Sequence, residues 1–460
     1  MIAVLLTSKF VYGDFILDAL TNIVDPRLLG KITVGLQPSS LSIGAFFVNI
    51  SAMMIAVLIS VVAFLMLFIS ALYIPLPNHI CDRQKIQIFE FLIRLTNEYF
   101  GDLVELLFGN KMRIYLSRFI VGFPYFFQRK PPKWCNIQIR EIAGVTCRIY
   151  TPDASMRKSD ALLIFIHGGG WMLMRPNYYD GPMYAIIAKT GMTVVSIDYK
   201  LAPKVTFPSP ILECEKVVKT IYEEEYRNLN IDRTKISIMG DSAGGNLSAV
   251  ICQRLLRAGL AHYVKSQVLI YPATNFTDFQ SPSYQYYENA YKGTGLLNPR
   301  IFARMVLVYL GIEVNPKNIQ LINQNKHVPK EIRESKEFKA ITSHSLLPSS
   351  FKQKDLYTEP ETPHPDPKLS QLFSPFLLNP DLNPIFGKNL EGLPEAMIIT
   401  VGIDILRDEG VLYGKRLESF NVPVKWFHYE RAFHGIMNMP KSRQRKRIIE
   451  DIVSFLENKI

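Results

Sequence analysis

The stretch "KISIMGDSAGGN", Lys235–Asn246, indicates the fold of this 460-residue chain most directly. Its first half is a short apolar run typical of a buried strand, and its second half places one serine among small residues. Gly240–Gly244 match the pattern G-x-S-x-G, in which a strand turns sharply into a helix and presents the serine hydroxyl as a nucleophile. Because small residues also suit a tight turn without any chemistry, the rest of the chain has to decide between the two interpretations.

Short apolar strands alternate with helices on both sides of this stretch. Strands are predicted in "ALLIFIHGGG", "MTVVSIDY", "SQVLIYPA" and "EAMIITVGID", and helices in "LECEKVVKTIY", "NLSAVICQRLLRAG" and "GVLYGKRLESF". This alternation is typical of an α/β protein with a mostly parallel sheet covered by helices on both faces. Residues 275–392 interrupt it with a long irregular section rich in Pro, Asn, Ser and Lys, which we expect to be an insertion over one end of the sheet.

Charge and cysteine content limit the partners. A net charge of +11 favours an anionic neighbour such as nucleic acid or a membrane surface. The sequence has neither zinc-finger spacing nor an RNA-binding signature, so we expect no nucleic acid partner. Five cysteines without a CxxC pair predict neither a disulfide framework nor a metal site, and we expect no metal and no cofactor. The oligomeric state stays open.

The run 52–73 is apolar apart from Ser60 and Ser70. About 20 apolar residues are enough to cross the core of a bilayer, so residues 52–74 are predicted to be a single transmembrane signal anchor. A buried core helix is the alternative, and the lack of any polar face argues against it. Residues 1–51 form an N-terminal extension of unknown role.

Residues 75–134 are predicted to form juxtamembrane or cap helices before the catalytic domain, residues 135–460. "IQIFEFLIRL" and "LVELLFGNKMRIYL" read as the apolar faces of two amphipathic helices. The following "FPYFFQRKPPKW", Phe123–Trp134, is aromatic first and basic after. A segment that docks on lipid and a packed loop with a solvated end both fit this pattern.

A serine nucleophile needs a base, and the base needs a group that orients it. Hydrolases with this strand–turn–helix motif have the chain order nucleophile, acid, histidine. Asp404 closes the strand in "IITVGID", and His434 follows the last strand in "AFHGIM". Strand ends hold side chains rigidly, so we predict Ser242, Asp404 and His434 as a catalytic triad.

Three other residues compete for these roles. His428 lies inside "VKWFHYE", where the alternation places it on the sheet rather than at its end. Asp408 and Glu409 are interpreted as acids in the first turn of a helix, where they complement the helix dipole.

The segment "HGGGW", His167–Trp171, directly follows a predicted strand. Consecutive glycines leave backbone N–H groups uncovered, and such groups stabilise an oxyanion. A phosphate-binding loop is the alternative, but the sequence lacks the GK[ST] ending and the GxGxxG spacing. His167 is expected to brace the loop rather than to react.

Several ordered motifs resemble those of the hormone-sensitive lipase group of α/β-hydrolases, and in particular its arylacetamide deacetylase-like members. They are "HGGGW", "DYKLAP", "GDSAGGN", "DILRDEG" and "FHG", and the resemblance covers residues 52–460. It implies the α/β-hydrolase fold with a helical cap, and it implies that the amides of Gly168, Gly169 and Ala243 form the oxyanion hole. Lys200 departs from the group, in which arginine is usual.

The resemblance further implies a membrane-anchored serine hydrolase that cleaves carboxylic esters, and arylamides, of apolar acyl substrates through an acyl-enzyme. Its partners would be a small apolar ester or amide and the lipid bilayer. A lipase acting on glycerides and a non-catalytic ligand receptor are the alternatives.

The resemblance places the protein in the endoplasmic reticulum membrane, single-pass, with a lumenal catalytic domain. Arg83, Lys85 and Arg94 oppose this orientation, because positive charge near a span favours the cytosolic side. Asn275 is the sequon predicted as a possible glycosylation site, since the sequon of Asn49 abuts the span and that of Asn246 adjoins the nucleophile.

Overall fold

The computed structural model describes residues 43–72, 76–77, 79–95, 100–127, 130–290 and 297–459. The chain divides into two compact units, Met1–Ala71 and Leu72–Ile460. Most of the predicted N-terminal extension, residues 1–42, lies outside the described residues.

The described part of the first unit belongs to the helix α4, Ile43–Leu72. Its section Ala52–Ser70 has a mean hydropathy of 3.0, and none of it is buried. This length and composition fit a single membrane-spanning helix, whereas the alternative of a core helix requires burial that this section lacks.

The second unit is built on an eight-stranded sheet with the order β1-β2-β4-β3-β5-β6-β7-β8. β2 pairs antiparallel with both β1 and β4, and the other neighbours are parallel. The strands are β1 (Cys135–Ile142), β2 (Val145–Pro152), β3 (Leu162–Ile166), β4 (Thr193–Ile197), β5 (Ile236–Asp241), β6 (Ser266–Ile270), β7 (Glu395–Ile403) and β8 (Val424–Phe433).

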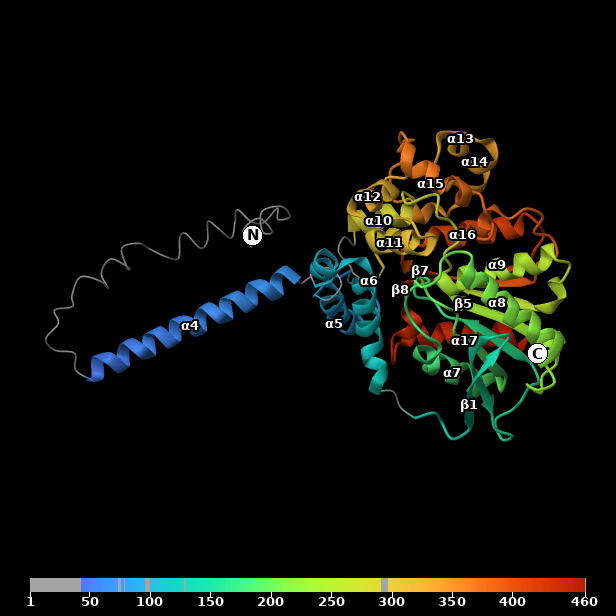
Figure 1. The fold of residues 1–460 in the computed structure, drawn as a ribbon, viewed down its shortest axis with the longest axis horizontal. Coiled ribbons are helices and arrows are strands. Elements are labelled where there is room, and N and C mark those ends of the chain that lie inside the picture. The colour runs from blue at the N-terminus through green and yellow to red at the C-terminus, as the bar shows by residue number, and fades with distance from the viewer. Residues whose placement is uncertain are drawn as a thin grey trace. The chain divides into compact units, whose positions relative to one another are not determined.

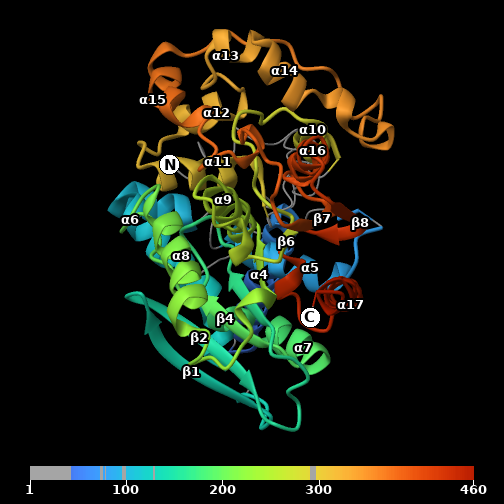
Figure 2. The ribbon, with the colours of Figure 1, turned by 90° about the vertical axis from the view of Figure 1, so that its right-hand side faces the viewer.

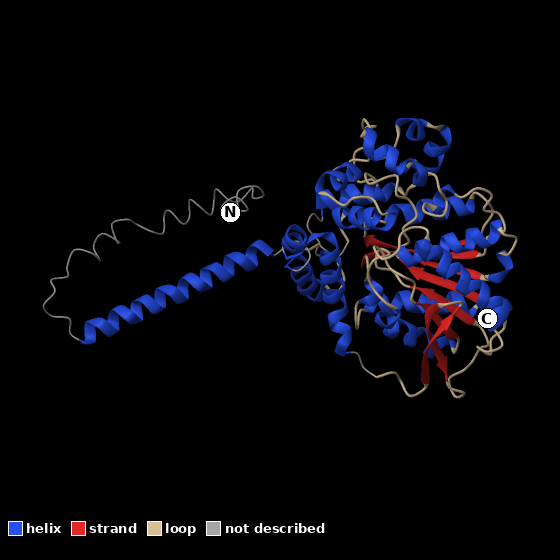
Figure 3. Ribbon diagram, in the orientation of Figure 1, coloured by secondary structure: helices blue, strands red, loops and turns tan. Residues whose placement is uncertain are grey.

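Helices cover both faces of this sheet, which Figure 3 shows as red strands enclosed by blue helices. α8 and α9 lie together on one face, and α7 and α17 lie together on the other (Figure 2). β3, β4 and β5 are buried along their whole length, which is why they read as apolar runs rather than as alternating patterns. The covering helices are α7 (Asp180–Thr190), α8 (Ser209–Thr220), α9 (Ala243–Arg257), α16 (Arg407–Glu418) and α17 (Arg443–Glu457).

The predicted insertion lies between β6 and β7 and is largely helical rather than irregular. Figure 1 shows its helices, yellow to orange, gathered beside one end of the sheet. Three of them begin with an Asn or Asp cap followed by proline: Asn298, Asn315 and Asp366 accept hydrogen bonds from the first turns of α11, α12 and α15. Proline at the first helical position and a polar cap before it start helices well. The helices are α10 (Pro282–Ala290), α11 (Pro299–Leu310), α12 (Pro316–Asn323), α13 (Lys330–Glu334), α14 (Lys336–Thr342) and α15 (Pro367–Leu377).

The first part of the second unit forms two helices, as the sequence predicts. α5 spans Arg83–Ile93, and α6 spans Gly101–Gly122 and runs into the short 3-10 helix η2, Phe123–Phe127. α6 is kinked at Gly109, whose φ of 81° and ψ of 171° are not helical. Glycine adopts this backbone conformation without the strain that a side chain would cause.

Candidate active site

Ser242 lies at the sharp turn between β5 and α9. Its φ of 54° and ψ of −120° are strained for a residue with a side chain. A Cβ atom on Gly240 would lie 2.2 Å from the carbonyl oxygen of Gly244, and one on Gly244 would lie 2.0 Å from that of Ile166. The glycines are therefore needed for the turn itself, and the turn presents the Ser242 hydroxyl at the carboxyl edge of the sheet.

The imidazole of His434 lies between Ser242 and Asp404. Its Nε2 is 2.9 Å from Ser242 Oγ, and its Nδ1 is 3.0 Å from Asp404 Oδ2. The Nδ1–Oδ2 pair lies at hydrogen-bond distance but is poorly aligned, as catalytic contacts often are before substrate binds. The structure thus brings together the three residues predicted from motif order.

Each member of the trio stands just beyond a parallel strand. Asp404 follows β7, and its other oxygen, Oδ1, accepts a hydrogen bond from the amide of Leu406 at 2.9 Å. His434 follows β8, its amide donates to the carbonyl of Ile403 at 3.1 Å, and its ring packs against that of Tyr271 with centroids 4.6 Å apart. Parallel strands end at one edge of the sheet, which explains why distant residues meet there.

His428 does not approach the serine. Its Nδ1 lies 2.9 Å from Thr400 Oγ1 and its Nε2 lies 2.8 Å from Glu430 Oε2, so both ring nitrogens have partners along β7 and β8. The choice of His434 over His428 as the candidate base agrees with this geometry.

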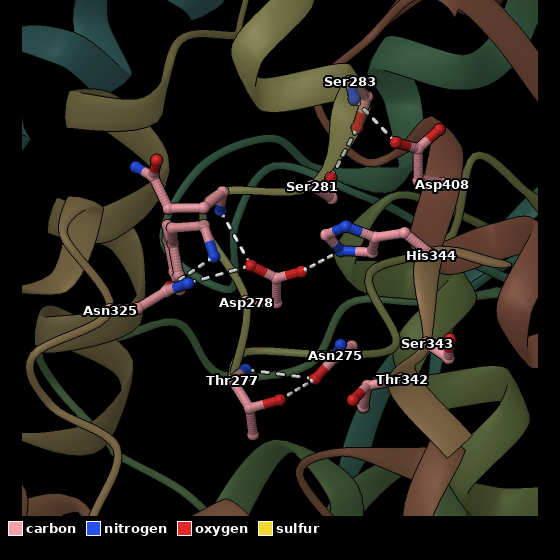
Figure 4. A network of polar contacts seen from close by, with 12 residues as sticks. Asn275, Thr277, Asp278, Ser281, Ser283, Asn325, Thr342, Ser343, His344 and Asp408 are labelled. Carbon is pink, nitrogen blue, oxygen red and sulfur yellow. Dashed lines mark hydrogen bonds and ion pairs between the residues drawn. The ribbon is translucent and has the colours of Figure 1, made fainter. Parts of the chain in front are cut away.

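Asp408 and Glu409 do lie in the first turn of α16, but both are buried. Asp408 accepts a hydrogen bond from the amide of Ser283 at 2.6 Å (Figure 4) and contacts the neighbouring Arg407 at 2.8 Å. Glu409 accepts from the amide of Thr274 at 2.8 Å, and burial raises the pKa of its carboxyl well above the usual range. Both acids therefore bind backbone amides near the start of the insertion. The interpretation of these acids as residues that complement the dipole of α16 did not predict this role.

The structure of the glycine loop after β3 contradicts the prediction that the Gly168 amide donates to the oxyanion. The amide of Gly168 donates to Asp241 Oδ1 at 2.8 Å, so it is not available to an oxyanion. Within the described residues, the amides of Gly169, Gly170 and Ala243 donate to no protein acceptor. Gly170, which the sequence reasoning passed over, therefore replaces Gly168 as a candidate oxyanion donor beside Gly169 and Ala243.

Both remaining glycines of the loop are required by close contacts and positive φ angles. Gly169 has a φ of 101°, and a Cβ there would lie 2.5 Å from the carbonyl oxygen of Leu173. Gly170 has a φ of 60°, and a Cβ there would lie 2.2 Å from Met305 Sδ of the cap helix α11. A side chain at Gly169 would displace the loop backbone, and one at Gly170 would displace Met305 or strain the loop at its positive φ.

Asp241, the residue before the serine, organises this loop and was not predicted. Besides the Gly168 amide it accepts hydrogen bonds from the hydroxyls of Tyr179 at 3.0 Å and Tyr271 at 3.4 Å. Burial raises the pKa of the Asp241 carboxyl to about 6, although the Gly168 and Tyr179 donors act in the opposite direction. The position of the loop relative to Ser242 therefore depends on a carboxyl group at the end of β5.

His167 braces the loop, as expected. Its Nδ1 lies 2.8 Å from the carbonyl oxygen of Gly168, and its ring stacks on Tyr199 with centroids 4.5 Å apart. Burial lowers the pKa of His167 to about 4, so the ring is neutral at neutral pH and unsuited to supplying positive charge.

The helix α6 also holds the loop, through Arg118. Its guanidinium donates to the carbonyl oxygens of Met172 at 2.9 Å and Ala202 at 2.7 Å. One side chain thus ties the glycine loop and the "DYKLAP" turn to α6. Lys200 of that turn donates to Glu213 Oε1 at 2.5 Å, so the lysine keeps an acidic partner.

Asn275 is 2% exposed, and its side-chain oxygen accepts hydrogen bonds from the amide and hydroxyl of Thr277 (Figure 4). A glycan needs its asparagine amide at the surface. The predicted glycosylation of Asn275 is therefore wrong for this fold. Among the described residues, no group of three or more His, Cys, Asp or Glu side chains could hold a metal ion.

Comparison with known proteins places this geometry in a family. Residues 163–329 and 367–438, more than half of the chain, match the family described as the alpha/beta hydrolase fold. The chain belongs to the α/β-hydrolase family. An esterase from the archaeon Pyrobaculum calidifontis has the same fold, with a TM-score of 0.55, 24% identity, and coverage of 81% of this chain and 97% of that one.

Two relatives define the group within this α/β-hydrolase family. The chain is 31% identical to arylacetamide deacetylase of Bos taurus over 400 residues, which cover 85% of this chain and 96% of that protein. It is 32% identical to neutral cholesterol ester hydrolase 1 of Mus musculus over 376 residues, which cover 79% and 89%. The chain is therefore an enzyme of the hydrolase class, related to esterases, and the predicted resemblance to arylacetamide deacetylase is confirmed.

Proposed function

We propose that this α/β-hydrolase is a membrane-anchored serine carboxylesterase with Ser242, His434 and Asp404 as its catalytic triad. One observation carries the proposal: a single imidazole lies 2.9 Å from the hydroxyl of Ser242, whose backbone is strained, and 3.0 Å from a buried carboxylate. A nucleophile, a base within hydrogen-bond reach and an orienting group are what acyl transfer requires.

In the proposed reaction, Ser242 Oγ attacks the acyl carbon while His434 Nε2 takes the hydroxyl proton. Asp404 holds the imidazole in the tautomer that has its free lone pair on Nε2, and it stabilises the charged ring that forms. The amides of Gly169, Gly170 and Ala243 receive the oxyanion. His434 then protonates the leaving group, and water repeats the sequence on the acyl-enzyme.

The proposed substrates are apolar acyl esters, with arylamides as a second class. Support comes from the names of the two relatives, a deacetylase of arylacetamides and a hydrolase of cholesterol esters. We expect the full-length protein to react with a fluorophosphonate probe at Ser242 and to hydrolyse a series of acyl esters. A Ser242→Ala variant that still labels would contradict the proposal, and a folded wild type that never labels would indicate a non-catalytic receptor.

The same ester series separates small-ester hydrolysis from the alternative of a glyceride lipase. We expect simple acyl esters to be hydrolysed faster than long-chain glycerides. Preference for long-chain glycerides over all of these would favour the lipase alternative.

We further propose that α4 anchors the enzyme once in the endoplasmic reticulum membrane, with the catalytic unit in the lumen. Support comes from an apolar section of α4 with no burial and from the likeness to the arylacetamide deacetylase group. In sealed microsomes we expect the catalytic unit to resist added protease until detergent opens the vesicles. Digestion of the catalytic unit by protease added to intact vesicles would show that this unit lies on the cytosolic side instead.

A further inference from the structure

The outer side of α6 and η2 is an apolar surface with no cover among the described residues. Leu106, Leu107, Phe108, Phe119, Phe123 and Phe127 form this surface, which we call the α6 apolar face. Their exposed fractions lie between 51% and 81%. Exposed apolar patches of this kind mark a surface that another molecule covers.

The aromatic part of the α6 apolar face is continuous. The rings of Phe119 and Phe123 have centroids 6.1 Å apart, and those of Phe123 and Phe127 are 5.7 Å apart, so the aromatic residues form one stripe at helical spacing. Leu106, Leu107 and Phe108 precede the kink at Gly109, where the helix changes direction. The sequence left open whether Phe123–Trp134 is a docking segment or a packed loop, and the exposure of the phenylalanines favours docking.

The inner side of α6 is already packed against the catalytic unit. Ile114 is 1% exposed and packs with Met172 and Val308. Arg304 of α11 donates to Glu105 at 2.8 Å and to Asn110 at 3.0 Å. Because the inner side already packs against the domain core, the apolar residues of the outer side do not contribute to that core and face away from it.

Two features of the chain favour a lipid surface as the cover. The chain from Leu72, where α4 ends, to Arg83, where α5 begins, can span at most about 40 Å whatever its path. Exposed Lys111, Lys130 and Lys133 accompany the aromatic residues in the same part of the chain. Phenylalanine and leucine enter the acyl region of a bilayer, while lysine binds anionic headgroups.

We propose that the α6 apolar face lies in the interface of the bilayer that α4 crosses, as a second, non-spanning membrane contact. The opposite side of α6 holds the glycine loop through Arg118, and Ile86 of α5 lines a cavity together with Asp404. The contact places the candidate active site next to the bilayer, in which apolar ester substrates dissolve. This consequence rests on the proposed function.

Tryptophan quenching in the full-length protein tests the contact without requiring catalysis. We would prepare Phe127→Trp and Leu106→Trp, and Leu372→Trp as a control at a 45% exposed leucine of the cap helix α15. Each variant is reconstituted in vesicles of phosphatidylcholine and phosphatidylserine, with and without bromine on the acyl chains. Protease resistance and vesicle flotation, compared with wild type, verify folding and anchoring.

We expect brominated lipid to remove most of the emission that the Phe127→Trp and Leu106→Trp substitutions add to the wild-type signal, and little of that added by Leu372→Trp. Equal emission in both lipids for the first two variants would overturn the proposal. In that case a blue-shifted emission would indicate a protein cover, including a second copy of the chain, and a water-like emission would indicate a solvated surface. A protein that does not float with vesicles would also overturn it, whereas failure of fluorophosphonate labelling alone would affect only the proposed esterase function.

Discussion

Replacing Asp241 by asparagine tests whether the site is built around a carboxyl group that resists ionisation. Burial raises the pKa of this carboxyl from 3.8 to about 6. Between these two pH values the folded chain binds a proton more readily than the unfolded chain. The stability from this group is therefore complete below about pH 4 and is lost as the pH rises through about 6. A shift of roughly 2 units corresponds to about 3 kcal/mol.

The Asp241→Asn variant cannot ionise, yet its Oδ1 can still accept the hydrogen bond from the Gly168 amide. We expect its free energy of unfolding, relative to wild type, to rise by about 3 kcal/mol between pH 4 and pH 7. For a unit of about 390 residues the unfolding entropy is on the order of 0.8 kcal/mol/K. The difference in melting temperature between variant and wild type should then grow by about 4 °C over this pH range.

The assay is thermal unfolding of the detergent-solubilised full-length protein at steps from pH 4 to pH 7. Ser237→Ala is the matched control, because Ser237 is a buried residue of the same strand whose hydroxyl does not titrate in this range. The melting temperature of Ser237→Ala should differ from that of wild type by the same amount at every pH. A difference between Asp241→Asn and wild type that is flat, or that falls with rising pH, would refute the reasoning.

Three further predictions concern the loop and the cap. Arg118→Met removes both hydrogen-bond donors to the carbonyls of Met172 and Ala202. It should lower kcat by roughly tenfold with little change in KM, and an effect on KM alone would contradict a positioning role. Gly170→Ala should lower kcat by about 10²–10³-fold, whereas Gly181→Ala, which has open space around its Cβ position, should match wild type. Asn275→Gln should leave the endoglycosidase sensitivity unchanged and lower the melting temperature; a lost mobility shift would show a glycan after all.

The clustering of Ser242, Asp404 and His434 and the sheet that positions them could be predicted from sequence because each depends on local signals. Ser242 lies in a strand–turn–helix motif, and Asp404 and His434 lie just past apolar runs that are recognisable as strands. Parallel strands end at one edge, so recognising the strands was enough to bring these residues together.

Two errors of prediction involve contacts between segments far apart in the chain, and a third comes from local composition. Gly168 was predicted as an oxyanion donor because nothing near it in sequence shows that Asp241 accepts its N–H group. Asn275 looked like a surface sequon, but the folded insertion buries it. The helices of the insertion were missed because its proline and asparagine content was interpreted as irregular structure, although these residues cap helices there.

The central claim is that Ser242 and His434 act as one catalytic unit, and a double-mutant comparison of kcat tests it most directly. The full-length enzyme, Ser242→Ala, His434→Ala and the combined variant would be measured on one ester, with His428→Ala as the control histidine. We expect each single variant to lose on the order of three or more decades in kcat, the combined variant to lose no more than either one, and His428→Ala to retain most activity. Additive losses in the combined variant, or a loss in His428→Ala as large as that in His434→Ala, would contradict the account.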